Sequence, residues 1–408
     1  MQDPLIFELA RTITDHALAA TPEIEIVGGL CERLAARGVP LRRVNVGIDT
    51  LHPLVGSRIY RWWRGSGIDC VEIDRERGSG STPAWRSSPY HHLMARGESL
   101  YRFRYPSPDG TYPFPVLEEL AAIGITDYVA CVHQLGDTAR MGELDGVFSS
   151  WAADGPSGFA DGDVALIDAI GPFLASAMVS AAVRRITRTL VETYLGCDAG
   201  ERVLRGAITR GVAERIRAVV WFSDLKGFTS MADSIDPALV LPLLDDYADP
   251  QVAAVHAHGG TVLKFIGDGL LAIFPVDESA ADAGGRALAA ADAAFGALAE
   301  VSARRAAAAL PTTEAYLALH LGEVFYGNIG GADRLDFTVI GPAVNEAARM
   351  SAMCRSLDQD ILVSQAFADA VPRSRPRLVP LGSHRLRGVT REQALHAIVP
   401  APPPEGRS

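Results

Sequence analysis

The stretch that most constrains the fold is residues 258–274, which read HGGTVLKFIGDGLLAIF. Two apolar runs, 261–266 and 270–274, flank a Gly-Asp-Gly tripeptide. β-branched and aromatic runs on both sides of such a turn predict a β-hairpin. Lys264 is a lone charge in the first strand, and Asp268 places a carboxylate at the tip. Taken alone, the pair also fits a snorkelling lysine and a turn aspartate, so the rest of the chain must decide.

The elements expected around this hairpin follow the split β-α-β plan. A strand at 218–222 and a helix at 236–256 precede it, and an alanine-rich helix at 279–309 follows. Later strands are expected at 314–321, 323–329, 336–340, 361–363, 383–386 and 394–399, with a helix at 343–353. The order β-α-β-β-α-β predicts a ferredoxin-like α+β domain over residues 214–400. The proline-rich tail, 401–408, is expected to be disordered.

The first half of the chain predicts a separate α+β domain. Residues 1–36 have a helical pattern; strands are expected at 44–48, 57–63, 70–73, 100–105, 127–133 and 146–151, with a helix at 115–123. Segment 146–178 contains a strand, a Gly-Phe turn and a helix rich in leucine, isoleucine and alanine. This segment resembles GAF-type sensor domains, which implies a GAF-like regulatory domain over 1–172. Its signal, an unknown small molecule or ion, stays open, and so does the alternative that it only dimerises.

A helix from about 163 to 194 joins the two halves. Within it Val179, Val183, Ile186 and Leu190 are spaced four, three and four residues apart, as in a coiled-coil stripe. The stripe lasts about two heptads, which is short for a secure assignment. Residues 173–213 are therefore either a parallel two-stranded helical linker or a helix packed on its own domain.

Charge and cysteine content exclude several classes of protein. The net charge of −11 argues against non-specific binding to nucleic acid or to anionic membranes. The five cysteines have no CxxC spacing, so a disulfide framework or a zinc site is not expected. The acidic N-terminus does not resemble a signal peptide, and no apolar run approaches about 18 residues, so we expect a cytoplasmic protein without a transmembrane segment. His91 and His92 have no third ligand and are read as a loop.

Residues 219–229, VVWFSDLKGFT, are the first candidate for chemistry. A buried strand ends at Asp224, a glycine turn follows, and Thr229 is a candidate N-cap. Successive backbone N–H groups after Asp224 can cradle phosphate oxygens. In a split β-α-β sheet the first strand lies beside the hairpin, so Asp224 and Asp268 can meet at one edge. Two carboxylates with backbone carbonyls suit Mg²⁺ or Mn²⁺, and without a cation they would repel.

Residues 334–350, RLDFTVIGPAVNEAARM, are the second candidate. Thr338 lies in a strand, and Asn345 and Arg349 share one face of the following helix. Asparagine can bond a ribose, and arginine can hold a phosphate bidentately as charge builds there. A solvated helix face is the alternative for these two residues taken alone.

Taken together, FSDLKGFT, HGGTVLKFIGDGLLAIF and DFTVIGPAVNEAARM resemble the class III nucleotidyl cyclase catalytic domain. The resemblance implies that Asp224 and Asp268, with the backbone of Leu225, hold two Mg²⁺ or Mn²⁺ ions. It also implies that Lys264 and Thr338 read the purine, a combination that goes with ATP in this family.

The same resemblance implies the remaining contacts with the nucleotide. Asn345 would orient the ribose, and Arg349 would stabilise the pentavalent phosphorus transition state. The phosphates would meet the segment Leu225, Lys226, Gly227, Phe228 and Thr229. Arg387, or Arg385 beside it, would reach the triphosphate.

In this family the site lies between two catalytic domains, and this chain holds both sets of residues with one such domain. The resemblance therefore implies a homodimer with two equivalent sites. The expected function is an adenylate cyclase regulated by the N-terminal domain. The alternatives are a guanylate cyclase and a silent module that binds nucleotide or dimerises without turnover. A diguanylate cyclase or polymerase would need a GG(D/E)EF-like hairpin, which the sequence does not contain.

Overall fold

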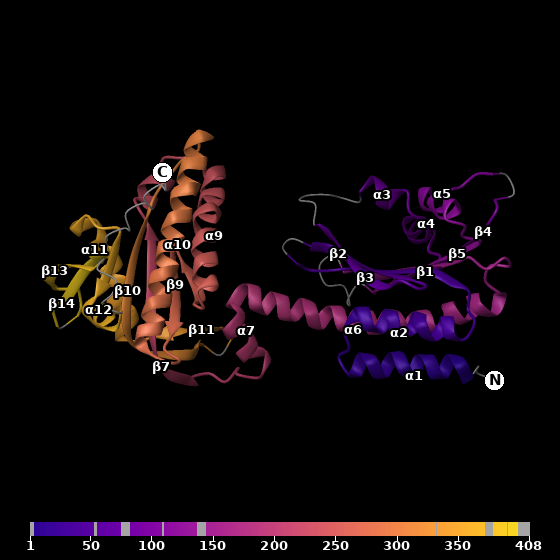
Figure 1. Ribbon diagram of the computed structural model, residues 1–408, viewed down its shortest axis with the longest axis horizontal. Helices are drawn as coiled ribbons and strands as arrows, with labels where there is room; N and C mark the ends of the chain where they lie inside the picture. The colour runs from indigo at the N-terminus through magenta and orange to yellow at the C-terminus, as the bar shows by residue number, and fades with distance from the viewer. Residues whose placement is uncertain are drawn as a thin grey trace, which may run out of the picture. The chain divides into compact units, whose positions relative to one another are not determined.

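The computed structural model describes residues 4–52, 55–74, 82–107, 110–136, 144–331, 333–371, 378–389 and 391–398. The chain divides into two compact units, Met1–Leu190 and Val191–Ser408 (Figure 1). The tail 401–408 and residue 399 of the last predicted strand lie outside the described residues.

The first unit is a six-stranded antiparallel sheet with helices on both faces (Figure 1). Its helices are α1 (Pro4–Leu18), α2 (Glu23–Ala36), α3 (Pro83–Arg86), α4 (Pro89–Arg96), α5 (Pro115–Ala122) and α6 (Asp161–Leu195), which runs past the unit boundary. Its strands are β1 (Leu41–Asp49), β2 (Val55–Trp63), β3 (Gly67–Asp74), β4 (Leu100–Arg104), β5 (Asp127–Gln134) and β6 (Gly146–Ala153), in the order β3-β2-β1-β6-β5-β4. Every strand predicted for this half is present.

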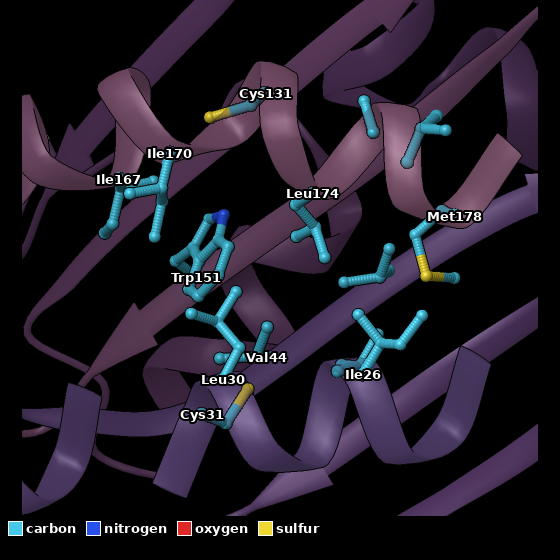
Figure 2. Packing of buried hydrophobic residues seen from close by; sticks show 14 of the residues in the cluster. Ile26, Leu30, Cys31, Val44, Cys131, Trp151, Ile167, Ile170, Leu174 and Met178 are labelled. Carbon is cyan, nitrogen blue, oxygen red and sulfur yellow. The ribbon is translucent and has the colours of Figure 1, made fainter. Parts of the chain in front are cut away.

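One face of this sheet forms the core with α2 and α6. Figure 2 shows Val44 and Trp151 of the sheet facing Leu30 of α2 and Leu174 of α6. Such a core follows from strand alternation, because every second side chain of β1 is buried on this face. The other face packs against α4 and α5 through a second cluster of buried residues that includes Phe148.

Helix α6 is long and apolar enough to cross a membrane, with a mean hydropathy of 1.8 in its most apolar window. Half of that window is buried inside the structure. Ile186 belongs to the core, and Val179, Val183 and Leu190 pack against it. The stripe predicted for a coiled coil is therefore in contact with its own domain, and core packing accounts for the apolar composition.

The prediction that His91 and His92 lie in a loop is wrong, because both belong to α4. Ser88 caps this helix by accepting a hydrogen bond from the N–H of His91 at 3.2 Å, and Pro89 occupies its first position. A serine followed by proline is a helix-start signal, and it explains why the chain is helical here. The ring of His92 packs edge-on against Phe114.

The second unit is built on an eight-stranded sheet. Its helices are α7 (Cys197–Leu204), α8 (Phe228–Ala232), the 3₁₀ turn η2 (Pro237–Leu239), α9 (Val240–Ala257), α10 (Ala280–Ala307), α11 (Pro342–Leu357) and α12 (Gln365–Ala370). Its strands are β7 (Ala213–Leu225), β8 (Thr261–Ile266), β9 (Gly269–Pro275), β10 (Ala315–Gly330), β11 (Leu335–Ile340), β12 (Ile361–Ser364), β13 (Leu378–His384) and β14 (Gln393–Ile398). The strand order is β13-β14-β12-β10-β7-β9-β8, and β11 pairs with β10.

The segment β10-β7-β9-β8 of this order, with α9 and α10, is the split β-α-β core that the sequence predicts. Buried residues of α10 pack on the face that carries Val219 and Trp221. Helix α11 lies on the opposite face, where Ala343 and Ala347 pack against Val220. The sheet is therefore covered on both sides.

The two strands predicted at 314–321 and 323–329 are one strand, β10. Gly322 does not interrupt it, because Gly322 pairs with Ala218 of β7 in regular register. A Cβ atom at Gly322 would lie 2.6 Å from the Cβ of Ala343. The glycine therefore permits the close approach of α11 rather than ending a strand.

Candidate active site

The predicted hairpin is formed by β8 and β9, and β8 carries a register shift between Val262 and Lys264. Val262 pairs with Ala272, whereas Lys264 pairs with Leu271. Residues that pair across strands share a face of the sheet, and Leu271 and Leu263 both belong to the cluster on the α11 face. The bulge therefore places Lys264 on the α11 face, where strict alternation would have grouped it with Val262.

On that face Lys264 meets Asp336 of β11. Its Nζ lies 2.7 Å from Oδ2 of Asp336, and both side chains are partly exposed. Thr338, which was predicted to read the base, is 4% exposed, and its Oγ1 has no hydrogen-bond partner among the described residues. Sequence reasoning missed Asp336, although its position two residues before Thr338 on a strand gives both the same face.

Asp224 at the end of β7 and Asp268 at the hairpin tip lie within hydrogen-bonding reach of each other. The N–H of Leu225 also donates to Oδ2 of Asp268 at 3.3 Å. A Cβ atom at Gly269 would lie 2.4 Å from the carbonyl oxygen of Ser223. Only glycine therefore lets the tip press against the end of β7, and this contact brings the two carboxylates together, as the sequence predicts.

The proximity of Asp224 and Asp268 changes the pKa of Asp224. The pKa of Asp224 is raised to about 6, first because its carboxyl is partly buried and then because of the charge and hydrogen bond of Asp268. A divalent cation would relieve the same repulsion that a proton relieves here. No group of three or more His, Cys, Asp and Glu in the described ranges could hold a metal. The two carboxylates would thus need further oxygen ligands from the backbone, nucleotide or water.

The loop after β7 was predicted to cradle phosphates, and two of its N–H groups are already engaged. The N–H of Leu225 donates to the carboxylate of Asp268, and the N–H of Lys226 donates to the carbonyl of Glu314 at 2.8 Å. The ammonium group of Lys226 pairs with Glu314 and Asp360 at 2.5 Å each. The ammonium group of Lys226 is therefore held by two carboxylates of the same chain.

The remaining part of this loop enters the short helix α8. Gly227 occupies its N-cap position with a φ of 65°. Thr229, predicted as the cap, lies inside the helix instead. The left-handed conformation at Gly227 explains the difference, because it lets the helix begin at Phe228, one residue before Thr229. Gly227, Phe228 and Thr229 remain the candidates for backbone contact with phosphate.

Asn345 and Arg349 lie one turn apart on α11 with exposed side chains. Neither side chain forms a hydrogen bond or ion pair with another described residue, so both are available to a ligand. Arg387 is exposed in the turn after β13, and Arg385 beside it is exposed as well. Because β13 and β8 are at opposite ends of the strand order, one chain does not place Arg387 beside the hairpin.

Comparison with known proteins bears on this domain. Residues 212–399 match the family model described as "Adenylate and Guanylate cyclase catalytic domain". An uncharacterized protein of Mycobacterium tuberculosis is 34% identical over 212 residues, which are 50% of this chain and 36% of that protein. The adenylate cyclase of Anabaena cylindrica is 32% identical over 160 residues, 38% of this chain and 31% of that protein. The chain thus spans about a third of the length of these curated relatives.

Solved structures give similar matches. The adenylyl cyclase CyaB from P. aeruginosa is 22% identical with a TM-score of 0.42, covering 47% of this chain and 97% of that one. The guanylyl cyclase Cya2 is 27% identical with a TM-score of 0.41, covering 48% of this chain and 97% of that one. Proteins named for each of the two nucleotides therefore occur among the matches.

Proposed function

We propose that this chain is an adenylate cyclase, because residues 212–399 match the family model of the adenylate and guanylate cyclase catalytic domain. The ribose 3′-oxygen of ATP would attack the α-phosphorus, and the bond to the β-phosphate oxygen would break. The products would be 3′,5′-cyclic AMP and pyrophosphate. The observation that carries the proposal is the carboxylate pair Asp224 and Asp268, in which the pKa of Asp224 is raised to about 6.

Asp224 and Asp268, with the carbonyl of Leu225, would hold two Mg²⁺ or Mn²⁺ ions, which when bound supply Lewis-acid activation and neutralise triphosphate charge. The residues fit this role chemically, because two carboxylates that repel each other are stabilised by a divalent cation. The other residues of the chain contribute by holding these two carboxylates in position. The Leu225 N–H fixes Asp268, and Gly269 keeps the tip against β7.

The specificity for ATP would come from Lys264 and its neighbours on β11. Adenine presents an acceptor at N1 beside a donor at its 6-amino group. The ammonium of Lys264 would donate to the ring nitrogen, and the carboxylate of Asp336 would accept from the amino group. Asn345 would bind the ribose, and Arg349 would bind phosphoryl oxygens as negative charge develops on them.

A homodimer is part of the proposal. Asn345 and Arg349 have exposed side chains on α11, and among the described residues neither forms a hydrogen bond or ion pair with Asp224 or Asp268. A second copy in a two-fold arrangement would bring α11 of one chain to the carboxylates of the other and create two equivalent sites. The first unit, which resembles GAF-type domains in segment 146–178, would regulate this activity.

The test is nucleotide turnover by the purified 408-residue protein with ATP or GTP and with Mg²⁺ or Mn²⁺. We expect cyclic AMP from ATP, loss of product in Asp268→Ala, and no change in the control Asp369→Asn, whose exposed carboxylate accepts a hydrogen bond from Gln365. Cyclic GMP as the main product would replace the assignment with a guanylate cyclase. Nucleotide binding without either product would identify a silent module.

A further inference from the structure

In the first unit, two arginines on neighbouring strands form no ion pair with any residue that the structure describes. On β1, Arg43 and Asn45 point to the face opposite the one that carries Val44, and Arg61 of β2 pairs directly across from Asn45. The Nε atoms of Arg43 and Arg61 and the Oδ1 of Asn45 are buried, and they have no hydrogen-bond partner in the described residues.

Polar and aromatic side chains surround these groups. Ser150 of β6 pairs across from Asn45 on its other side. The hydroxyl of Tyr90 on α4 lies within hydrogen-bonding reach of Ser150 and Tyr128. The guanidinium of Arg43 lies 5.2 Å from the centroid of the Trp63 ring. The sheet face thus offers hydroxyl and amide groups around two cations.

No ion pair with a described residue balances the positive charges of Arg43 and Arg61. The pKa of Arg43 is lowered, first by burial and then by the charge of Arg61, while Tyr90, Tyr128 and Glu119 act in the opposite direction. Asp69 of β3 pairs across from Arg61 but is exposed, and Glu119 of α5 is exposed as well. Neither acid forms an ion pair with Arg43 or Arg61 in the described part of the chain. Burying like charges that no ion pair compensates is unfavourable, and a bound anion would relieve that cost.

We propose that Arg43, Arg61 and Asn45 bind a small dianionic oxyanion, either a phosphate group or a dicarboxylate. Guanidinium groups hold such oxygens bidentately, and a ligand charge of −2 would match the two arginines. Asn45 and the hydroxyls of Tyr90 and Ser150 would supply further hydrogen bonds, and the Trp63 ring would hold the Arg43 fork in place. This site is independent of the cyclase proposal, because it concerns the first unit alone.

The test uses the intact protein, with inorganic phosphate and succinate as separate probes at constant ionic strength set by chloride. We expect a saturable change in tryptophan fluorescence and a rise in Tm with one probe, since a ligand that binds the folded state stabilises it. Arg43→Lys and Arg61→Lys keep the charge but lose the fork, and should raise the half-saturating concentration about tenfold or more. Arg64→Lys, at an exposed arginine that pairs with Asp154, is the matched control.

The two probes separate the two sources of the oxyanion, since a phosphate site and a dicarboxylate site differ in geometry. A response to neither probe would overturn the proposal, as would a response that both lysine variants retain. Arg61→Gln in chloride buffer gives a second readout. If Arg61 serves a ligand, this change leaves the Tm unchanged or raises it, because an unpaired like charge is removed. A clear fall in Tm without any anion response would assign a structural role instead.

Discussion

The ammonium nitrogen of Lys264 lies 2.7 Å from Oδ2 of Asp336, 72 positions further along the chain. This ion pair joins the hairpin that carries Asp268 to the strand that precedes α11. The β-bulge at Leu263 makes the contact possible, because it turns Lys264 to the face of the sheet on which β11 lies.

Asp336→Asn should lower kcat/KM for ATP by about tenfold to a hundredfold, the usual effect of losing a hydrogen bond to a charged group. The preference for ATP over GTP should fall with it. Initial rates with both nucleotides measure both effects, and Asp333→Asn in the exposed turn before β11 is the control. An increase in kcat/KM would mean that the ion pair competes with the base instead of assisting it.

The glycines on the two sides of Asp268 provide a matched pair of substitutions. Gly269→Ala should reduce activity at least tenfold, because its Cβ would lie 2.4 Å from the Ser223 carbonyl and would push the tip away from β7. Gly267→Ala should cost only about 1 kcal/mol in stability, because its φ is 64° and no atom lies within 4 Å of the added carbon. Rates and Tm values of both variants check this, and equal activity in the two would contradict the role given to Gly269.

The raised pKa of Asp224 predicts how metal binding depends on pH. Below about 6 a proton competes with the cation for this carboxylate. The affinity for Mn²⁺ in the absence of nucleotide should therefore fall by up to about tenfold per pH unit below that value, which electron paramagnetic resonance can measure. Asp268→Asn should move this window to lower pH, because the neighbouring charge is gone. A flat profile from pH 5 to 7 would count against the pairing.

The same shift has a consequence for stability in metal-free protein. The pKa of Asp224 in the folded state lies above its ordinary value of 3.8. Its contribution to stability is therefore fully present below about pH 4 and is lost as pH rises through about 6. Comparing unfolding of the wild type with Asp224→Asn across this range should show a difference that grows with pH, and that Mg²⁺ removes.

Mixing two inactive variants tests the shared site. Arg349→Ala should cost about 10² or more in rate and leave the Tm unchanged, because the exposed side chain forms no hydrogen bond or ion pair with another described residue. Asp268→Ala should be inactive because it lacks one of the two carboxylates proposed to hold the metal ions. If each site takes its metal carboxylates and its arginine from different chains, mixing the two variants should restore about a quarter of wild-type activity. No recovery, with mixed dimers demonstrated, would place the whole site within one chain.

Most elements of the fold could be predicted because their periodicity is local. The hairpin, the alanine-rich helix and the strands of the first unit follow from alternation and turn residues. Interactions between distant segments account for the exceptions. Gly322 looks like a strand break, and only its contact with Ala343 of α11 shows that it permits helix packing. Likewise, the stripe from Val179 to Leu190 has coiled-coil spacing, and only the tertiary structure shows that it packs on its own domain.

The candidate site also has features that could be predicted from the sequence and features that depend on contacts between distant segments. That Asp224 and Asp268 meet could be predicted, because strand order in a split β-α-β sheet fixes which ends are neighbours. The contact between Asp336 and Lys264 could not be predicted, since the face of Lys264 depends on a bulge that no pattern in 261–266 indicates. The engaged N–H groups of Leu225 and Lys226 also depend on partners distant in sequence. Assignments of Asn345, Arg349 and Arg387 remain predictions.

The bulge in β8 has a consequence for how such a hairpin can change during evolution or in the laboratory. The bulge adds one residue, Leu263, to β8 relative to β9. Removing Leu263 would restore strict alternation of side chains between Thr261 and the tip. Lys264 would then follow Val262 directly and would stay opposite Leu271 on the α11 face, so the deletion would remove only the Leu263 side chain from that face. The bulge therefore lets β8 carry one additional apolar side chain beside Lys264, a feature that a single-residue deletion tests and that substitution scanning never samples.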